Sequence, residues 1–105
     1  MVTKTEKIGN KVVLRVLKDI DDLKSGEEFK AALMDLYKSG EKEIIIDFTP
    51  IHLINSHGIG KILMFYRRFK AIGGQIYVAP LNESIREIFE TLMLDKLIPE
   101  RKLYE

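Results

Sequence analysis

Apolar and polar residues recur in this chain with two periods, and the changes from one period to the other predict the order of its elements. Residues 2–8 and 11–17 show the alternation of half-buried strands. The Gly9-Asn10 pair between them is a two-residue turn signal, so these runs predict a β-hairpin. The first run carries several lysines, which suit an exposed edge strand because they discourage pairing with other chains.

A helical period follows the hairpin. Its apolar positions recur at the spacing of one helix face and are Phe29, Ala32, Leu33 and Leu36. Ser25 and Glu28 have the form of a capping box, so we expect Ser25 to be the N-cap. Gly40 is expected just beyond the end of the helix, where a glycine is favoured.

The middle of the chain predicts a strand, a helix and a strand. Residues 43–48 are largely apolar and β-branched, and the run stops before Pro50, which cannot donate to a sheet ladder. The helical period continues to Ile72, and residues 75–79 again read as a strand. Strand, helix and strand at this spacing form a parallel, right-handed unit.

The last third of the chain predicts one more helix, capped by Asn82. The apolar face of this helix consists of Ile85, Ile88, Phe89 and Leu92. Residues 94–98 are expected to be a short strand or turn, and residues 99–105 a short helix or tail. We therefore predict a single α/β domain over residues 1–105, with an N-terminal β-hairpin, a mixed and mostly parallel sheet of four or five strands, and three or four helices.

Composition removes several classes of function. A formal net charge of +1 argues against a nucleic-acid-binding surface. No apolar run approaches the length that spans a bilayer. The first residues are polar and charged rather than a signal peptide, and the chain has no cysteine, so we expect a cytoplasmic protein that does not bind membranes.

The start of the middle helix is the most informative stretch. Asn55 or Ser56 is expected to be its N-cap, and Gly58 and Gly60 allow a close approach of the backbone to another surface. The first turn of a helix offers free N–H donors and the positive end of the macrodipole, so a phosphate on Ser56 would be stabilised there. The alternative is that Asn55 and Ser56 only cap the helix.

The residues around Ser56 resemble a known family signature. Asp47-Phe48-Thr49 followed by Ile54-Asn55-Ser56-His57-Gly58-Ile59-Gly60 is similar to the motif of the sulfate-transporter and anti-sigma-factor-antagonist (STAS) domain. In that family a strand ending in Asp-Leu-Ser is followed by Asp-Ser-Ser/Thr-Gly-Leu-Gly. Three further segments match the family pattern, Ile20-Asp21, residues 71–74 and residues 94–97.

The resemblance implies a function and a set of partners. Short bacterial STAS proteins are anti-sigma factor antagonists, which bind an anti-sigma factor that is also a serine kinase. That kinase phosphorylates the first serine of the motif, here Ser56, and the modification ends the binding. A serine phosphatase that resets the switch would be a further partner.

Some positions differ from the family pattern or have two interpretations. Asn55 stands where the family usually has Asp, His57 where it has Ser or Thr, and Met93 where it has Gly. Asp21 lies in an acidic connection that could run beside the loop before Ser56 in a parallel sheet. The resemblance implies that Asp21 sets the electrostatics around Ser56, and the alternative is a solvated loop.

The helix after Ser56 has more apolar surface than one buried face needs. Ile59, Ile62, Tyr66 and Phe69 are expected on the buried side, with Leu63 at its margin. Met64, Phe65 and Ile72 then point sideways or outward among Lys and Arg residues. We expect a partner-binding surface of Ile59, Gly60, Met64 and Phe65. The alternative is a wide core contact.

Enzymatic chemistry finds little support in the residue pattern. A hydrolase would need a base facing Ser56, and His57 is its neighbour in a helix, where successive residues do not face each other. His52 and His57 lack the further ligands of a metal site, and the glycines lack the rest of a nucleotide-binding motif. We expect no enzymatic activity, metal or cofactor. The phosphorylated binding switch and a STAS-type scaffold or small-ligand module without phosphorylation stay open, ahead of a small hydrolase.

Overall fold

The computed structural model describes residues 1–104 of the chain, and within them the expected order of elements is found. In chain order the elements are β1 (Thr3–Ile8), β2 (Lys11–Val16), α1 (Leu23–Lys38), β3 (Glu43–Asp47), α2 (Ser56–Ala71), β4 (Gln75–Val78), α3 (Glu83–Thr91) and the 3₁₀-helix η1 (Leu94–Lys96). Residues 97–104 form a tail with a single parallel bridge between Val78 and Glu100. The expectation for Glu105 lies outside the described residues.

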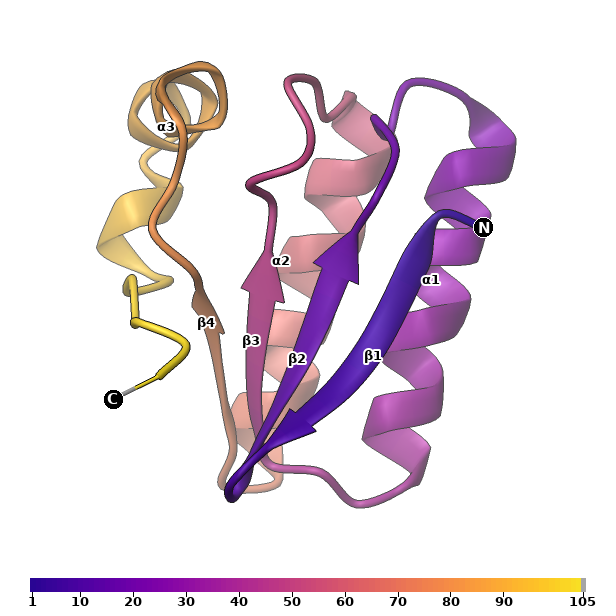
Figure 1. Cartoon of the computed structure of the whole chain (residues 1–105), viewed down its shortest axis with the longest axis vertical. Helices are drawn as coiled ribbons and strands as arrows, with labels where there is room; N and C mark the ends of the chain where they lie inside the picture. Colours follow the sequence, from indigo (N-terminus) through magenta and orange to yellow (C-terminus); the bar gives the residue numbers. More distant parts are fainter. Residues whose placement is uncertain (105) are drawn as a thin grey trace.

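The four strands form one sheet in the order β1-β2-β3-β4 (Figure 1). β1 and β2 are antiparallel and are joined at Gly9, whose φ of 61° suits a hairpin turn. β2 pairs with β3 and β3 with β4 in parallel. The predicted mixed, mostly parallel sheet with an N-terminal hairpin is therefore confirmed, with four strands and three α-helices.

The two long helices lie on one face of the sheet, and α3 lies beyond the β4 edge (Figure 1). The main core fills the space between α1, α2 and the sheet, where the side chains of Ile44 and Ile46 are fully buried. A smaller apolar cluster on the opposite face consists of Val13, Ile45 and Ala79, and Leu103 of the tail packs against it. The carboxyl ends of β2 and β3 and the first turns of α1 and α2 lie at the same end of the molecule (Figure 1).

The start of α1 differs from the expectation by one turn. Asp22, not Ser25, is the N-cap, and its Oδ1 accepts a hydrogen bond from the backbone N–H of Ser25 at 2.7 Å. The hydroxyl oxygen of Ser25 accepts from the backbone N–H of Asp22 at 3.2 Å. The capping box therefore exists, but Ser25 fills its third position, because a carboxylate three residues earlier is available as the cap.

The buried face of α2 is also rotated from the expected one. Phe65 is fully buried, whereas Ile59 and Tyr66 are only partly buried. The cause is α1, which packs beside α2 as well as above the sheet: the Tyr37 ring lies 6.4 Å from the Phe65 ring and 5.6 Å from the Phe69 ring, in edge-to-face geometry. The prediction that Phe65 points outward is wrong.

Candidate functional site

Two loops run side by side at the carboxyl ends of β2 and β3. The backbone N–H of Ile20 donates to the carbonyl of Leu53 at 3.0 Å, and the N–H of Asn55 donates to the carbonyl of Ile20 at 2.7 Å. Ile20 and Ile54 thereby form an isolated parallel bridge. The predicted proximity of the Asp21 loop to the loop before Ser56 is confirmed.

Ser56 is the first residue of α2, and Asn55 is its N-cap. Asn55 is extended (φ −79°, ψ 176°), and its Oδ1 accepts from the backbone N–H of Gly58 at 2.9 Å. The Ser56 side chain is exposed, and its hydroxyl has no hydrogen bond to the part of the chain that the structure describes. The site thus presents an uncommitted hydroxyl at the positive end of a helix.

Gly58 allows the first turn of α2 to press against these loops. A Cβ at this position would lie 2.7 Å from Cγ2 of Ile54 and 2.9 Å from Cγ2 of Ile20, closer than real Cβ atoms approach. Gly60 differs, because a Cβ there would have no described atom within 4 Å beyond its chain neighbours and the adjacent helix backbone. The expected close approach is therefore confirmed for Gly58. Gly60 is exposed and makes no such approach within the described chain, so its place in a partner-binding surface stays a prediction.

His57 lies where the first turns of α1 and α2 approach each other. A Cβ on Gly26 of α1 would lie 3.8 Å from the Cβ of His57, so the two first turns are in van der Waals reach. The His57 side chain itself is exposed. The residue after Ser56, His57, therefore lies close to the first turn of α1.

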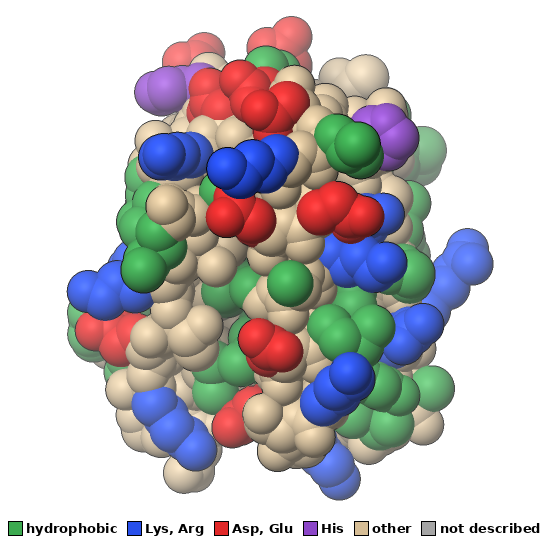
Figure 2. All heavy atoms as spheres, turned by 90° about the vertical axis from the view of Figure 1, so that its right-hand side faces the viewer, with side chains coloured by type: hydrophobic (Ala, Val, Ile, Leu, Met, Phe, Trp, Pro, Cys, Tyr) green, Lys and Arg blue, Asp and Glu red, His purple; other side chains and the backbone are tan. Residues whose placement is uncertain are grey.

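The aspartates of the β2–α1 connection have separate tasks. Asp19 holds the neighbouring loop, since its Oδ1 accepts from the backbone N–H groups of His52 at 2.9 Å and Leu53 at 3.3 Å. Asp22 caps α1, and the hydrogen bond from the Ser25 backbone N–H lowers the pKa of its carboxyl. Asp21 is exposed. Acidic side chains gather at this end of the molecule, with a histidine on each side (Figure 2).

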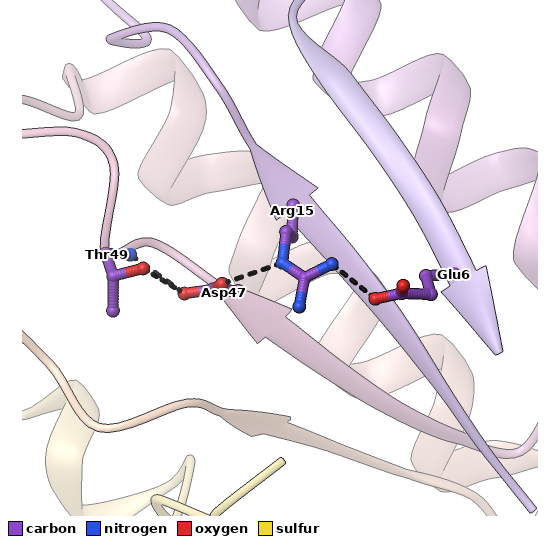
Figure 3. Close-up of polar contacts among 4 residues, drawn as sticks. All are labelled: Glu6, Arg15, Asp47 and Thr49. Carbon is purple, nitrogen blue, oxygen red and sulfur yellow. Dashed lines mark hydrogen bonds and ion pairs between the residues drawn. The ribbon is translucent and has the colours of Figure 1, made fainter. Parts of the chain in front are cut away.

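A second polar group supports the other end of the Ser56 loop. The buried carboxylate of Asp47 accepts from Thr49 twice, from its backbone N–H at 3.0 Å and from its hydroxyl at 2.7 Å. The guanidinium of Arg15 donates to Asp47 at 3.3 Å and also pairs with Glu6, so the group crosses from β1 to the end of β3 (Figure 3). The hydrogen bond with Glu6 is the main cause that raises the pKa of Arg15.

The partner-binding residues expected on α2 divide into three groups. Gly60 is exposed, Ile59 and Met64 are partly buried, and Phe65 belongs to the core. Two apolar residues that the sequence reasoning missed are more exposed, Leu53 at 46% in the loop before Ser56 and Leu23 at 69% at the start of α1. Neither belongs to a periodic apolar pattern, so the sequence contained no signal that would have identified them.

Other kinds of site are not found within residues 1–104. No three His, Asp or Glu side chains in this part of the chain lie close enough together to hold a metal ion. Among the helices that the structure describes, none has the length and apolar character to cross a bilayer.

The fold and the site define a class of protein: a small α/β domain with a mixed sheet, helices on one face, and an exposed serine at the start of the helix after β3. The family model of the STAS domain matches residues 2–105, and the chain belongs to the STAS domain family.

Individual relatives agree with this assignment. A protein of Bordetella bronchiseptica named as an anti-sigma factor antagonist, BtrV, is 22% identical over 79 residues, which are 75% of this chain and 68% of that protein. TM1081 of Thermotoga maritima, assigned as an anti-sigma factor antagonist, superposes with a TM-score of 0.83 at 19% identity, over 98% of this chain and 86% of its own. The phosphorylated form of SpoIIAA, a cell fate determinant of Bacillus, superposes with a TM-score of 0.73 at 20% identity, over 95% and 91% of the two chains. At these identities the structural likeness shows the fold alone.

Proposed function

We propose that this protein is an anti-sigma factor antagonist that binds a serine-kinase anti-sigma factor and is released when the kinase phosphorylates Ser56. The observation that carries the proposal is the place of Ser56: it is exposed, it is the first residue of α2, and its hydroxyl is uncommitted in the described chain. The names of the relatives support the same function, as does SpoIIAA, which has been solved in unphosphorylated and phosphorylated forms. ATP supplies the phosphate, so we place this switch in the cytoplasm.

The charge of the phosphate explains the release. A phosphate on Ser56 adds about −1.5 to −2 charges near neutral pH. The helix start stabilises this charge, so the modified protein stays folded. A partner that covered Ser56 would have to remove water from the phosphate, which costs free energy. Acidic side chains such as exposed Asp21 in the adjoining loop would also repel the phosphate. A loss of about 3 kcal/mol weakens binding more than a hundredfold.

The surface proposed to contact the kinase comprises the start of α1, the loop before Ser56 and part of α2. It consists of Leu23, Leu53, Ile59, Gly60 and Met64, and Phe65 is no longer included because it is buried. Leu53 and Leu23 are the most exposed apolar members, and exposed apolar side chains with a polar rim are typical of a binding patch.

The residues that differ from the family pattern are compatible with this function. Asn55 accepts from the Gly58 N–H, which is the contact that an aspartate cap would make. It therefore keeps the helix start in place with one negative charge fewer beside Ser56. His57 packs toward Gly26 and leaves the Ser56 hydroxyl open.

The test is incubation with ATP and the serine-kinase anti-sigma factor, followed by intact-mass measurement. We expect the wild type to gain one phosphate and Ser56→Ala to gain none. The control Ser25→Ala should still gain one, because the Ser25 side chain is buried in the wild type. Ser56→Asp should bind the kinase at least about a hundredfold more weakly than the wild type. No phosphate gain, together with tight binding of Ser56→Asp, would contradict the proposal. A serine phosphatase should restore binding of the modified protein.

A small-ligand module without phosphorylation is the second candidate, and one observation favours it. A hollow of about 570 Å³ lies beside the loops, with Lys18, Asp21, Lys24 and His52 in its lining. Such a module predicts that a small molecule protects the protein from thermal unfolding and that Ser56→Ala leaves this protection unchanged.

A further inference from the structure

Asn82 makes contacts on both sides of its amide group. It is the N-cap of α3, and its Oδ1 accepts from the backbone N–H of Ile85 at 3.0 Å. Its amide nitrogen donates to the carbonyl of Ile51 at 2.7 Å, with the carbonyls of Thr49 and Phe48 farther away at 3.4 and 3.5 Å. The oxygen must face the N–H and the nitrogen must face the carbonyls, so the contacts define the orientation of the amide.

The carbonyls that Asn82 reaches belong to the turn that opens the Ser56 loop. In this turn the N–H of Ile51 donates to the carbonyl of Phe48 at 3.1 Å, and the side chain of Ile51 is buried. After Ile51, Asp19 holds the next two N–H groups and Ile20 holds Leu53 and Asn55. Ser56 is the next residue. The loop is therefore held from the β2 side by Asp19 and Ile20, from β3 by Asp47, and from α3 by Asn82.

The start of α3 is itself braced by the C-terminal tail. The carboxylate of Glu100 accepts from the backbone N–H of Leu81 at 2.9 Å and pairs with Arg86 at 3.2 Å. Arg86 also donates to the carbonyl of Leu81 at 3.0 Å. These contacts fix the backbone beside Asn82, the residue after Leu81, whose side chain bonds to Ile51.

We propose that Asn82 is a positioning residue for Ser56: its side-chain donor couples α3 to the loop and sets the presentation of the serine to the kinase. The proposal rests on the proposed function of Ser56. Capping α3 needs only the oxygen of Asn82, whereas holding the loop needs its nitrogen, so the two roles can be separated by substitution.

The variant Asn82→Asp keeps the cap oxygen and removes the donor. We expect the N–H groups of His52, Leu53 and Asn55 to exchange with solvent about tenfold faster than in the wild type at about pH 7, while the α3 amides keep their protection. Asn82→Ser, which caps α3 but is too short to reach Ile51, should have the same effect on the loop without adding a charge. The matched control is Asn55→Asp, the same chemical change at a cap whose amide nitrogen has no hydrogen bond within residues 1–104, and it should leave the loop unchanged.

A pH series distinguishes the two roles by sign. A protonated carboxyl can donate to Ile51, so the extra exchange of the loop in Asn82→Asp should shrink between about pH 7 and pH 3. If Asn82 only capped α3, the ionised carboxylate would be the better cap, and α3 rather than the loop would lose protection toward low pH.

The phosphorylation assay completes the test. We expect kcat/KM for phosphorylation of Asn82→Asp to fall about tenfold relative to the wild type. Wild-type exchange rates in the loop of Asn82→Asp, or a loosened loop with an unchanged kcat/KM, would overturn the proposal. If the wild type accepts no phosphate, the proposed function is wrong, and Asn82 cannot position Ser56 for phosphorylation. The exchange measurement still decides whether Asn82 holds the loop, so the two failures are distinguishable.

Discussion

The first turns of α1 and α2 lie at the same end of the molecule and contain similar residues (Figure 1). Their serines differ, because one is buried and the other is exposed. Each helix is capped by an Asp or Asn side chain, Asp22 or Asn55, and each has a serine in its first turn. Ser25 is only 7% exposed and its hydroxyl is fully engaged, whereas Ser56 is exposed and uncommitted in the described chain.

The position relative to the cap explains the difference. Ser25 is the third residue of its helix, from which a side chain reaches back to the N–H of the cap. Ser56 is the first residue of its helix, where its side chain is exposed and its hydroxyl makes no hydrogen bond to the described chain. A serine at the third position therefore stabilises the helix start, and a serine at the first position is available to a partner or a kinase.

The glycines of the two first turns give the largest expected contrast. Gly58→Ala should lower the free energy of unfolding by about 2–3 kcal/mol, because the new Cβ would collide with Ile54 and Ile20. Gly26→Ala is the control: its Cβ would meet His57 at an ordinary 3.8 Å, so the better helix former should stabilise the protein by about 0.5–1 kcal/mol. Urea unfolding monitored by circular dichroism measures both changes. Equal effects would mean that the first turn of α2 is no more tightly packed than that of α1.

The serines themselves give an intermediate contrast. Ser25→Ala should cost about 1 kcal/mol of unfolding free energy, because the hydroxyl accepts from the backbone N–H groups of Asp21 and Asp22 at 3.2 Å and donates to the Asp22 carbonyl at 3.1 Å. Ser56→Ala should change it by less than about 0.5 kcal/mol. Chemical denaturation of both variants against the wild type is the measurement. A large loss of stability in Ser56→Ala would assign that hydroxyl a structural role and weaken the proposed switch.

The caps give the smallest contrast, visible in the pH dependence. The pKa of Asp22 is lowered in the folded state, so its stabilising contribution is present above the unfolded pKa of about 3.9 and is lost as the pH falls through the folded value. The difference in Tm between the wild type and Asp22→Asn should therefore favour the wild type at about pH 6 and shrink progressively as the pH falls below about 4. The amide of Asn55 does not titrate, so the cap of α2 contributes no such change. A difference in Tm that stays constant with pH would contradict the assignment of Asp22 as an ionised cap.

Local sequence signals predicted the parts of the fold that depend on local chemistry. The Gly9-Asn10 turn, the strand before Pro50 and the cap Asn82 were predictable, and the cap of α2 was narrowed to Asn55 or Ser56, because each depends on one or two side chains acting on their own backbone. The cap of α1 was not predictable, because Ser25-x-x-Glu28 and Asp22-x-x-Ser25 are both acceptable capping boxes and only the folded loop shows which one forms.

Contacts between distant segments decided the remaining features. The helical period of α2 was evident from the sequence. Which face of α2 is buried was decided by α1, where the Tyr37 ring packs against the buried Phe65. Asp19 and Asn82 lie 31 to 34 residues from the backbone groups of the Ser56 loop that they hold, and no local pattern indicates such pairs.

The sequence by itself determined the order of strands and helices and the serine at a helix start, because period, turn residues and caps act over a few neighbouring residues. The tertiary structure alone decided which apolar residues are covered, which serine is committed to a helix start, and how Asp19 and Asn82 converge on one loop. The physical reason is that burial and long-range hydrogen bonds depend on the neighbours that folding brings together, and these neighbours are far apart along the chain.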